Sequence, residues 1–450
     1  MSNKIYPIGI QNFEKIRNDG YFYIDKTALM YQMVKTGSYY FLSRPRRFGK
    51  SLLISTLEAY FQGKKELFEG LAVEKLEKDW IKHPILHLDL NIEKYDTPES
   101  LDKILNDNLE YWESQYGTRP SETSFSLRFA GIIQRACEKT GQRVVILVDE
   151  YDKPMLQAIG NEELQKQFRN TLKPFYGALK TKDGYIKFAL LTGVTKFGKV
   201  SVFSDLNNLD DISMWNEYVE ICGVSEREIH ENLEAELHEF AAARGITYDK
   251  LCEDLRECYD GYHFTHNSIG MYNPFSLLNA FKRKEFGSYW FETGTPTYLV
   301  KLLKKHHYDL ERMAHEETDV QVLNSIDSES TNPIPVIYQS GYLTIKGYDE
   351  EFGMYRLGFP NREVEEGFIR FLLPFYANVN KVESPFEIQK FVREVRSGDY
   401  NSFFRRLQSF FADTTYEVIR DQELHYENVL FIVFKLLGFY TKVEYHTSEG

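Results

Sequence analysis

The sequence predicts an α/β fold with a parallel sheet in its first 220 residues, and three observations support this. Short β-rich runs alternate with helical patterns, which is the rhythm of a parallel sheet flanked by helices. One of these runs, residues 144–148, is apolar throughout, as expected of a strand that is buried on both faces. A turn rich in glycine and arginine, residues 44–49, joins an earlier run to a helix.

Individual elements follow from local signals. The first strand is the aromatic run YYFL, and the helix after it begins at Ser51. A later helix opens with Thr97 as N-cap and Pro98 at its first position, and another stops at Gly141. We expect strands at residues 39–42, 85–90, 144–148 and 186–191. We expect helices at residues 51–61, from 98 onward, at 123–140 and at 162–179.

After the sheet the pattern becomes mainly helical. Ser225 and Glu228 form the signature of a capping box, and helical patterns continue to about Lys305. Residues 318–335 are polar and rich in Ser and Asn, which predicts a loop. Two β-rich runs on either side of residues 349–353 predict a hairpin, and helices resume beyond it.

These changes of pattern divide the chain into four parts. The last part has a helix at residues 423–439 and a strand at 443–446 without a partner, so we expect the chain to be truncated. We predict the sheet domain at residues 1–220, a helical lid at 221–310, a winged-helix-like or helical middle module at 311–415 and the start of another α/β domain at 416–450.

Composition narrows the classes of protein. Lys and Arg number 54 and Asp and Glu 67, a net charge of −13, which is unlike a bulk nucleic-acid binder. The four cysteines form no C-x-x-C pair and are expected to be reduced thiols of a cytoplasmic protein. Signal-peptide and membrane-span patterns are absent from the sequence, so no membrane association is expected.

The turn before the first predicted helix carries the strongest chemical signal. The run RRFGKS at residues 46–51 lies between a strand and a helix, where backbone N–H groups cradle phosphates. Lys50 would reach the β- and γ-phosphates and Ser51 would bind Mg²⁺. Arg44 stands where the general P-loop pattern has its first glycine, and Pro45 could preset the backbone instead. We expect the nucleotide to contact Arg46, Arg47, Phe48, Gly49, Lys50, Ser51 and Leu52.

A second signal lies about 100 residues later, where the apolar strand ends in two acids. Asp149 fits the role of holding Mg²⁺, and Glu150 that of the general base for the attacking water. Thr192 ends the next strand and could sense the γ-phosphate, or simply satisfy the backbone there. Arg47 and Lys196, like Arg46, are candidates for stabilising transition-state charge, with an ordinary surface cation as the alternative for each.

Together these segments resemble the bacterial AAA-ATPase-like family. The resemblance rests on the runs YIDKT, RPRRFGKS, VDEYDKP and LTGVTKF, and on YDGY, YNP and SGYLTI further on, so it covers nearly the whole chain. Family members have Arg at the position of Arg44. The resemblance implies an ATPase core that binds ATP and Mg²⁺, a helical lid and a middle module, often followed by a PD-(D/E)XK nuclease-like domain. Only the first helix and strand of such a domain would be present, so no nuclease activity is expected.

Three functions remain open. The first is an ATPase that acts as a nucleotide-dependent switch on a partner or effector, and the second is a nucleotide-binding module without hydrolysis. The third is a nucleic-acid-processing ATPase tied to a nuclease domain, with the hairpin as a candidate DNA contact. Asp152 would orient a partner Arg or start a turn, His263 is expected to be a packing residue, and Tyr23 and Asp25 are guesses for adenine contacts. A protein partner, nucleic acid or a second copy of the chain remain candidates as partners.

Overall fold

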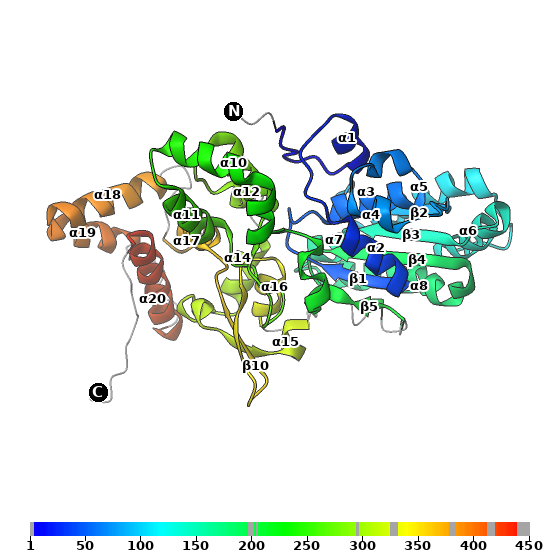
Figure 1. Ribbon diagram of the computed structural model, residues 1–450. Helices are drawn as coiled ribbons and strands as arrows, with labels where there is room; N and C mark the ends of the chain where they lie inside the picture. The colour runs from blue at the N-terminus through cyan, green and yellow to red at the C-terminus, as the bar shows by residue number, and fades with distance from the viewer. Residues whose placement is uncertain are drawn as a thin grey trace.

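The computed structural model describes residues 4–196, 202–203, 206, 208–293, 297–324, 332–377, 384–411 and 419–438. The chain forms two halves, one built on a parallel sheet and one mainly helical, with a β-hairpin that projects from the second half (Figure 1). The predicted strand at 443–446 and the rest of the last 12 residues lie outside the described residues. Within the described residues, every helix is too short or too polar to span a bilayer.

A five-stranded parallel sheet forms the core of the first half. Its order is β2-β3-β4-β1-β5, so β4 lies between β1 and β3. All residues of β1 and β3 are buried, which explains their unbroken apolar sequences. The strands are β1 (Tyr39–Ser43), β2 (Ile85–Asp89), β3 (Val144–Asp149), β4 (Ile186–Gly193) and β5 (Asp210–Asp211).

Helices flank this sheet (Figure 1). The one after β1 starts at Lys50, and the one after β2 has Pro98 at its first position and Thr97 as its N-cap. The helix before β3 ends at the left-handed Gly141, as predicted. The helices are α1 (Phe13–Asn18), α2 (Thr27–Thr36), α3 (Lys50–Phe61), α4 (Ala72–Leu76), α5 (Pro98–Tyr116), α6 (Phe125–Thr140), α7 (Lys153–Gln157) and α8 (Glu162–Thr181), with 3-10 turns η1 (Lys65–Phe68) and η2 (Asp183–Tyr185).

The next segment, predicted as a lid, is mainly helical and has a core of its own. The capping box at Ser225 and Glu228 opens its first helix, as predicted. Residues between Val224 and Tyr289 pack into a cluster separate from the main core. The elements are η3 (Ile212–Met214), η4 (Asn216–Ile221), β6 (Val224–Ser225), α10 (Glu226–Arg244), α11 (Tyr248–Tyr259), β7 (Met271–Tyr272), α12 (Pro274–Arg283), α13 (Tyr289–Glu292) and α14 (Thr297–Lys305).

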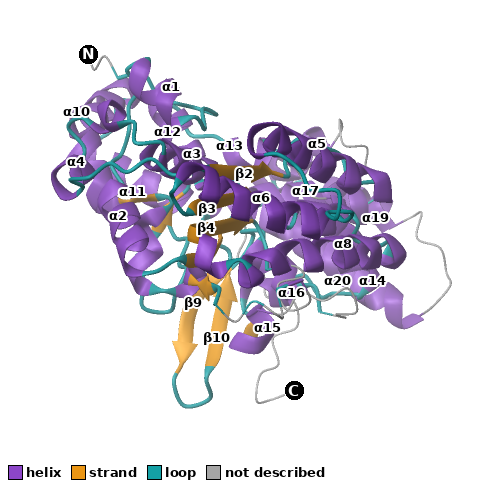
Figure 2. Ribbon diagram, turned by 90° about the vertical axis from the view of Figure 1, so that its right-hand side faces the viewer, coloured by secondary structure: helices purple, strands orange, loops and turns teal. Residues whose placement is uncertain are grey.

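A three-stranded antiparallel sheet follows, in the order β8-β10-β9. The predicted hairpin is confirmed as β9 and β10, and it projects from the body of the protein (Figure 2). The loop predicted at 318–335 is wrong for residues 318–324, which form the end of β8 and helix α15, and for residues 334–335, which begin α16; residues 325–331 lie outside the described residues. Thr318 and Leu323 are buried although the sequence around them is polar, and Thr318 pairs with Tyr355 of the distant strand β10. The elements are η5 (Glu311–Ala314), β8 (Glu317–Asp319), α15 (Val320–Asn324), α16 (Ile334–Gln339), β9 (Thr344–Asp349) and β10 (Met354–Gly358).

Four helices complete the described chain. Asn361 caps the first of them with its side chain, and the predicted helix near residue 423 is confirmed as the last. The main core is continuous from the sheet to these helices, so the two halves share one hydrophobic interior. The helices are α17 (Arg362–Tyr376), α18 (Ser384–Ser397), α19 (Tyr400–Phe411) and α20 (Ile419–Leu436).

Candidate functional site

The loop between β1 and α3 is shaped to surround an anion. Arg47 and Gly49 have positive φ values of 68° and 98°, and Gly49 is the N-cap of α3. Such a conformation is strained for any side chain, which accounts for glycine at position 49. The helix begins at Lys50, so its unpaired N–H groups and the positive end of its dipole meet the loop.

Arg44 does not need the freedom of glycine. It is not among the described residues with positive φ, and its N–H donates to the Gly193 carbonyl at 3.1 Å, which continues the pairing of β1 with β4. Its side chain turns into the interior and is 1% exposed. The departure from the general P-loop pattern is therefore a change of packing and leaves the turn intact.

Lys50 is buried at the first position of α3 and faces two kinds of partner. Its Nζ donates to the carbonyl oxygens of Arg44 at 3.1 Å and Pro45 at 3.4 Å. It also lies 3.4 Å from Oε1 of Glu150, which comes directly after β3. The ammonium is thus held between its own loop and the acid at the neighbouring strand end.

Thr192 and Asp149 are brought together because β4 lies between β1 and β3. The Thr192 hydroxyl donates to Oδ1 of Asp149 at 2.6 Å, and the Glu150 N–H donates to the same oxygen at 3.1 Å. Both residues are almost fully buried. The carboxylate of Asp149 is therefore fixed in orientation at the carboxyl edge of the sheet, where open α/β sheets bind ligands.

Glu150 combines an unusual backbone with an unusual environment. Its φ is 55°, in the left-handed region that few residues other than glycine adopt. Burial raises the pKa of its carboxyl from 4.5 to about 7, Lys50 opposes that rise, and Asp152 and Asp149 add to it. A carboxyl that titrates near neutrality is suited to exchange a proton with water.

Asp152 binds the backbone that follows β4, next to the site. Its side chain is fully buried and accepts hydrogen bonds from the N–H groups of Val194 and Thr195 and from the Thr195 hydroxyl. It holds the loop after β4 in place and forms no ion pair with an Arg of the described chain. Of the two roles predicted for it, orientation of an Arg is therefore not seen.

A pocket of about 360 Å³ opens beside these groups. Its walls come from the N-terminal segment 7–11, the loop, the strand ends and the lid. Arg47 lies over the ring of Phe275 in the lid at 5.1 Å, and forms no ion pair with a described residue. The polar residues of its lining include Arg46, Arg47, Lys50, Ser51, Asn91 and Glu150.

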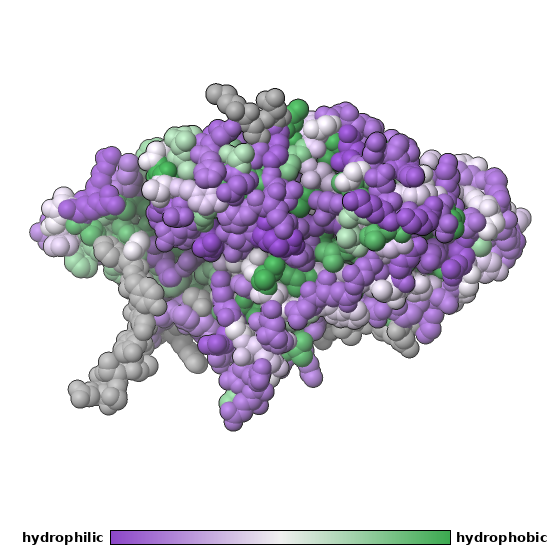
Figure 3. All heavy atoms as spheres, in the orientation of Figure 1, coloured by the Kyte–Doolittle hydropathy of each residue, from purple (hydrophilic) through white to green (hydrophobic). Residues whose placement is uncertain are grey.

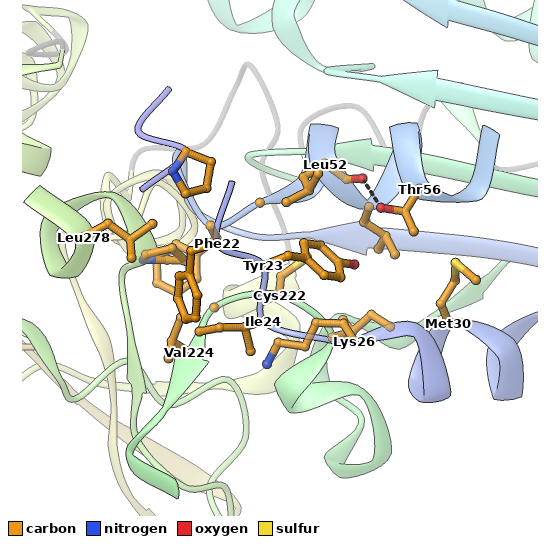
Figure 4. Close-up of a pocket in the computed structure, with 17 residues that line it drawn as sticks. Phe22, Tyr23, Ile24, Lys26, Met30, Leu52, Thr56, Cys222, Val224 and Leu278 are labelled. Atoms are coloured by element: carbon orange, nitrogen blue, oxygen red, sulfur yellow. Dashed lines mark hydrogen bonds between the residues drawn. The ribbon is translucent and has the colours of Figure 1, made fainter. Parts of the chain in front are cut away.

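A smaller apolar pocket of about 110 Å³ adjoins the first and shares Gly49, Leu52 and Leu278 with it. Figure 4 shows residues 22–24 of the N-terminal segment between Leu52 of α3 and Val224 at the start of the lid. Tyr23 lines this pocket. Asp25 does not, because its carboxylate accepts hydrogen bonds from residues 27 and 72.

Three further predicted residues have different surroundings. Arg46 lines the larger pocket, but its guanidinium lies over Trp290 at 4.5 Å. Phe48 packs its ring inward against the lid side of the core. Lys196 lines neither of these two pockets; it is buried near Arg44 and Pro45 on the other side of the loop and pairs with Asp211 at 2.8 Å.

Comparison with known proteins identifies the family of this chain. Residues 7–203 match the model of a family described as predicted AAA-ATPase. A protein of Azotobacter chroococcum mcd 1, named only as an uncharacterized protein in the vnfD 5′ region, is 35% identical over 464 residues, covering 100% of this chain and 86% of that protein. The chain belongs to the predicted AAA-ATPase family. The predicted family is thus confirmed, while a nuclease domain is not shown.

Among solved structures, the ORC2 protein of Aeropyrum pernix, determined as ADPNP-ADP complexes, is similar at 10% identity. The match covers 80% of this chain and 92% of that chain, with a TM-score of 0.28. A likeness at that score supports no conclusion about this family member.

Sequence reasoning missed the part of this predicted AAA-ATPase site that comes from outside the loop and strands. Residues 7–11, Asn91 and Phe275 line the larger pocket, yet none lies in a motif that predicts phosphate contact. One signal was present, because Asn273 before Pro274 marks the start of a helix. Asn273 caps α12, the lid helix that faces the pocket.

The donors at this site fit Mg²⁺. Ser51 lines the larger pocket, and Asp149 directly precedes Glu150, another residue of its wall. A hydroxyl and a carboxylate are oxygen donors, which Mg²⁺ prefers as ligands. No group of three or more His, Cys, Asp or Glu side chains in the described part of the chain could hold a metal by itself.

Proposed function

We propose that this protein binds Mg-ATP in the two adjoining pockets and hydrolyses it. The observation that carries the proposal is the 3.4 Å contact between Lys50 and Glu150 at the mouth of an N–H-lined loop, with Thr192 and Asp149 alongside. A buried ammonium, a near-neutral carboxyl and oriented oxygen donors are the groups that phosphoryl transfer to water needs.

Binding would divide the nucleotide between the pockets. The phosphates would lie in the larger one, on the backbone N–H groups of the loop and on Lys50, and displace that ammonium from Glu150. Arg47 would add a second positive charge near the γ-phosphate. The apolar pocket suits a nucleotide base, since its polar groups Lys26 and Thr56 are already bound to Glu228 and to the Leu52 carbonyl.

Hydrolysis would then use the released carboxylate. Glu150, once free of Lys50, would accept a proton from the attacking water. Thr192 would keep Asp149 oriented at the metal position together with Ser51. Mg²⁺, when bound, would neutralise charge on the phosphates.

The same loop is well placed to report the nucleotide to the second half of the chain. The Arg46 carbonyl accepts hydrogen bonds from Nε1 of Trp290 at 3.0 Å and from Asn273 at 3.4 Å. Its guanidinium donates to the Tyr342 hydroxyl at 3.3 Å. A movement of the loop on binding phosphate would therefore pull on the lid and on the segment before β9, which supports a nucleotide-dependent switch.

We infer that this second half includes a winged-helix-like module. Helix α14, strand β8, helices α15 and α16, and the hairpin β9–β10 follow in the order of such a unit. The second helix of the pair, α16, is largely buried, and Gln339 at its end accepts a hydrogen bond from the Lys196 N–H. This helix is therefore used to contact the ATPase half.

Nucleic-acid binding through the hairpin gains no support from its chemistry. The turn between β9 and β10 carries three exposed carboxylates, at Asp349, Glu350 and Glu351, and the hairpin surface is mainly hydrophilic (Figure 3). Acidic groups repel phosphates. A partner protein, or a second copy of the chain, is the better candidate for what the switch controls.

The decisive experiment is ATP hydrolysis with Mg²⁺, measured with ATP binding, for the wild type and Glu150→Gln. We expect the variant to bind ATP with similar affinity and to turn over about 10²- to 10⁴-fold more slowly, the usual contribution of a general base. If the wild type binds ATP without turnover, the alternative of a binding module is correct. If it does not bind ATP at all, the proposal is wrong.

A further inference from the structure

The amino edge of the parallel sheet carries a group of positive charges. Parallel strands all start at one edge of a sheet, so residues that lead into them meet there. Four basic residues do so, each before or at the start of one of the strands β1 to β4, and together they are called the basic edge: Lys35, Lys82, Arg143 and Lys187. This edge is opposite the carboxyl edge, where the candidate nucleotide site lies.

These cations lie close enough to act on one another. Nδ1 of His83, in the segment that leads into β2, is 2.8 Å from the Arg143 carbonyl oxygen in the segment that leads into β3. Burial lowers the pKa of Lys187, and the charges of Arg143 and Lys35 lower it further, although Glu77 opposes them. Like charges held together repel, so an opposite charge from outside would stabilise them.

Acidic groups of the same chain compensate only part of this charge. Lys35 pairs with Glu77 at 2.9 Å, and a second carboxylate, Asp183, accepts a hydrogen bond from the Tyr39 hydroxyl at 2.7 Å. The other three members of the basic edge form no ion pair with a residue that the structure describes, and two of them are exposed. The edge therefore keeps an excess of positive charge in a chain whose net charge is −13.

The turn of the β9–β10 hairpin carries the opposite charge. Asp349, Glu350 and Glu351 are consecutive exposed acids at the end of a hairpin that projects from the body of the protein (Figure 2). The N–H groups of Glu351 and Phe352 donate to the Asp349 carboxylate at 2.9 and 3.1 Å, which orders the turn before any partner arrives. A charged projection that is already ordered loses little conformational entropy when it binds.

Apolar side chains accompany both charged surfaces. Phe352, directly after the three acids, is 71% exposed. Leu76, at the end of α4, is 44% exposed, and Ile81, which directly precedes Lys82 of the basic edge, is 48% exposed. Burial of a Phe ring against two aliphatic side chains adds an attraction that does not depend on charge. An acidic tip with an apolar residue therefore fits a basic edge with apolar residues beside it.

Within one chain the two surfaces are turned away from each other. Residues of the lid, Pro274 and Phe275 among them, line the pocket at the carboxyl edge of the sheet, so the amino edge faces away from the half that carries the hairpin. The hairpin tip of one chain is thus free to meet the basic edge of a neighbour.

We propose that the acidic hairpin tip of one copy of this protein binds the basic edge of a second copy. Because the two surfaces differ, the contact is heterologous and repeats from copy to copy, either closing into a ring or extending as a filament. Its charges are exposed to solvent, so the association is weak and sensitive to salt.

The test is sedimentation velocity of the full chain at concentrations up to about 100 μM, in about 0.05 M and about 0.5 M salt. We expect the wild type to associate at low salt and to be monomeric at high salt. The tip variant, Glu350→Lys with Glu351→Lys, should associate at least about tenfold more weakly at low salt, because like charges then face each other. The edge variant, Lys82→Glu with Arg143→Glu, should show the same loss.

A matched control separates local charge from net charge. Asp107→Lys with Glu285→Lys replaces two exposed acids elsewhere and changes the net charge by the same amount as the tip variant. We expect this control to associate like the wild type.

An equimolar mixture of the tip and edge variants separates the proposal from a folding defect. The tip variant is basic on both surfaces and the edge variant acidic on both, so each repels itself and attracts the other. We expect the mixture to associate at low salt although each variant alone is monomeric.

A wild type that is monomeric at low salt, a tip variant that associates like the wild type, or a mixture that stays monomeric would overturn the proposal. Binding of a single-stranded oligonucleotide by a monomeric wild type, lost in the edge variant, would assign the basic edge to nucleic-acid phosphates instead. None of these measurements uses ATP turnover, so this proposal and the proposed function can fail separately.

Discussion

The loop at residues 44–50 has two sides with different surroundings. On one side Lys50 faces Glu150 at 3.4 Å beside a pocket of about 360 Å³. On the other, Pro45 lies against Gly341 and Arg46 stacks on Trp290 at 4.5 Å. Charged groups next to a cavity can exchange partners when a ligand enters, whereas close-packed groups transmit displacement to their neighbours. Chemistry and transmission should therefore be separable by substitutions on opposite sides of one loop.

Removal of the Lys50 ammonium, on the pocket side of the loop, should have the largest effect, a loss of affinity for ATP. Lys50→Ala deletes the charge that would meet the phosphates, and loss of a buried charge partner costs about 2–5 kcal/mol, roughly 30-fold or more in affinity. Equilibrium dialysis with labelled ATP measures this loss of affinity. Lys64→Ala, which removes a lysine paired with Glu14 at the surface, is the control and should bind normally. Unchanged affinity in Lys50→Ala would place the phosphates elsewhere.

On the packed side, Gly341→Ala should destabilise the fold without touching the chemistry. The added Cβ would lie 2.6 Å from Cβ of Pro45, and φ at this glycine is +89°. Strain and overpacking predict a loss of about 1–3 kcal/mol in the free energy of unfolding, measured with urea.

Gly398→Ala separates the two causes of that loss. Gly398 also has a left-handed φ, +75°, but nothing lies within 4 Å of its added Cβ. The control therefore reports the backbone cost alone, and the difference between the variants reports the contact with Pro45. Equal losses in the two variants would mean that the contact between loop and module carries no energy.

The pH dependence of the pocket side follows from Glu150. Its pKa is raised to about 7, mainly by burial, so below that pH the carboxyl is protonated and cannot accept a proton from water. We expect kcat/KM for ATP to fall about tenfold per pH unit below the inflection and to level off above it. An inflection near 4.5, the ordinary value, would show that Glu150 does not act as the base in this environment.

How far the sequence predicts the molecule differs between these regions. Strands β1 to β4 were predictable because each is rich in apolar residues, and Lys50, Asp149 and Glu150 because they follow or precede such segments. The two-residue strands β5, β6 and β7 were not, since so short a run has no periodicity.

Missed features of the site share one physical cause, namely contact between segments far apart in the chain. Lys196 is drawn from the phosphates by Asp211, a residue of the next strand. Arg44 is buried against Phe264 of the lid side. Residues 318–324 were predicted as a loop because Thr318 pairs with Tyr355 of β10, a contact that the local sequence does not show. The spacing of residues along the sequence does not predict contacts between such distant segments.

The smallest expected effect concerns Trp290, which contacts Arg46 on the packed side of the loop. Trp290→Phe keeps an aromatic ring beside Arg46 but removes the hydrogen bond from Nε1 to the Arg46 carbonyl, worth about 1 kcal/mol of stability. We expect little change in KM for ATP, and loss of most of the change in tryptophan fluorescence that ATP causes in the wild type. Trp112→Phe, in α5 against Phe129, is the matched control and should keep that signal. A signal that survives in Trp290→Phe but disappears in Trp112→Phe would mean that nucleotide binding is reported within the sheet domain, and the contact between loop and lid would then be packing without a part in transmission.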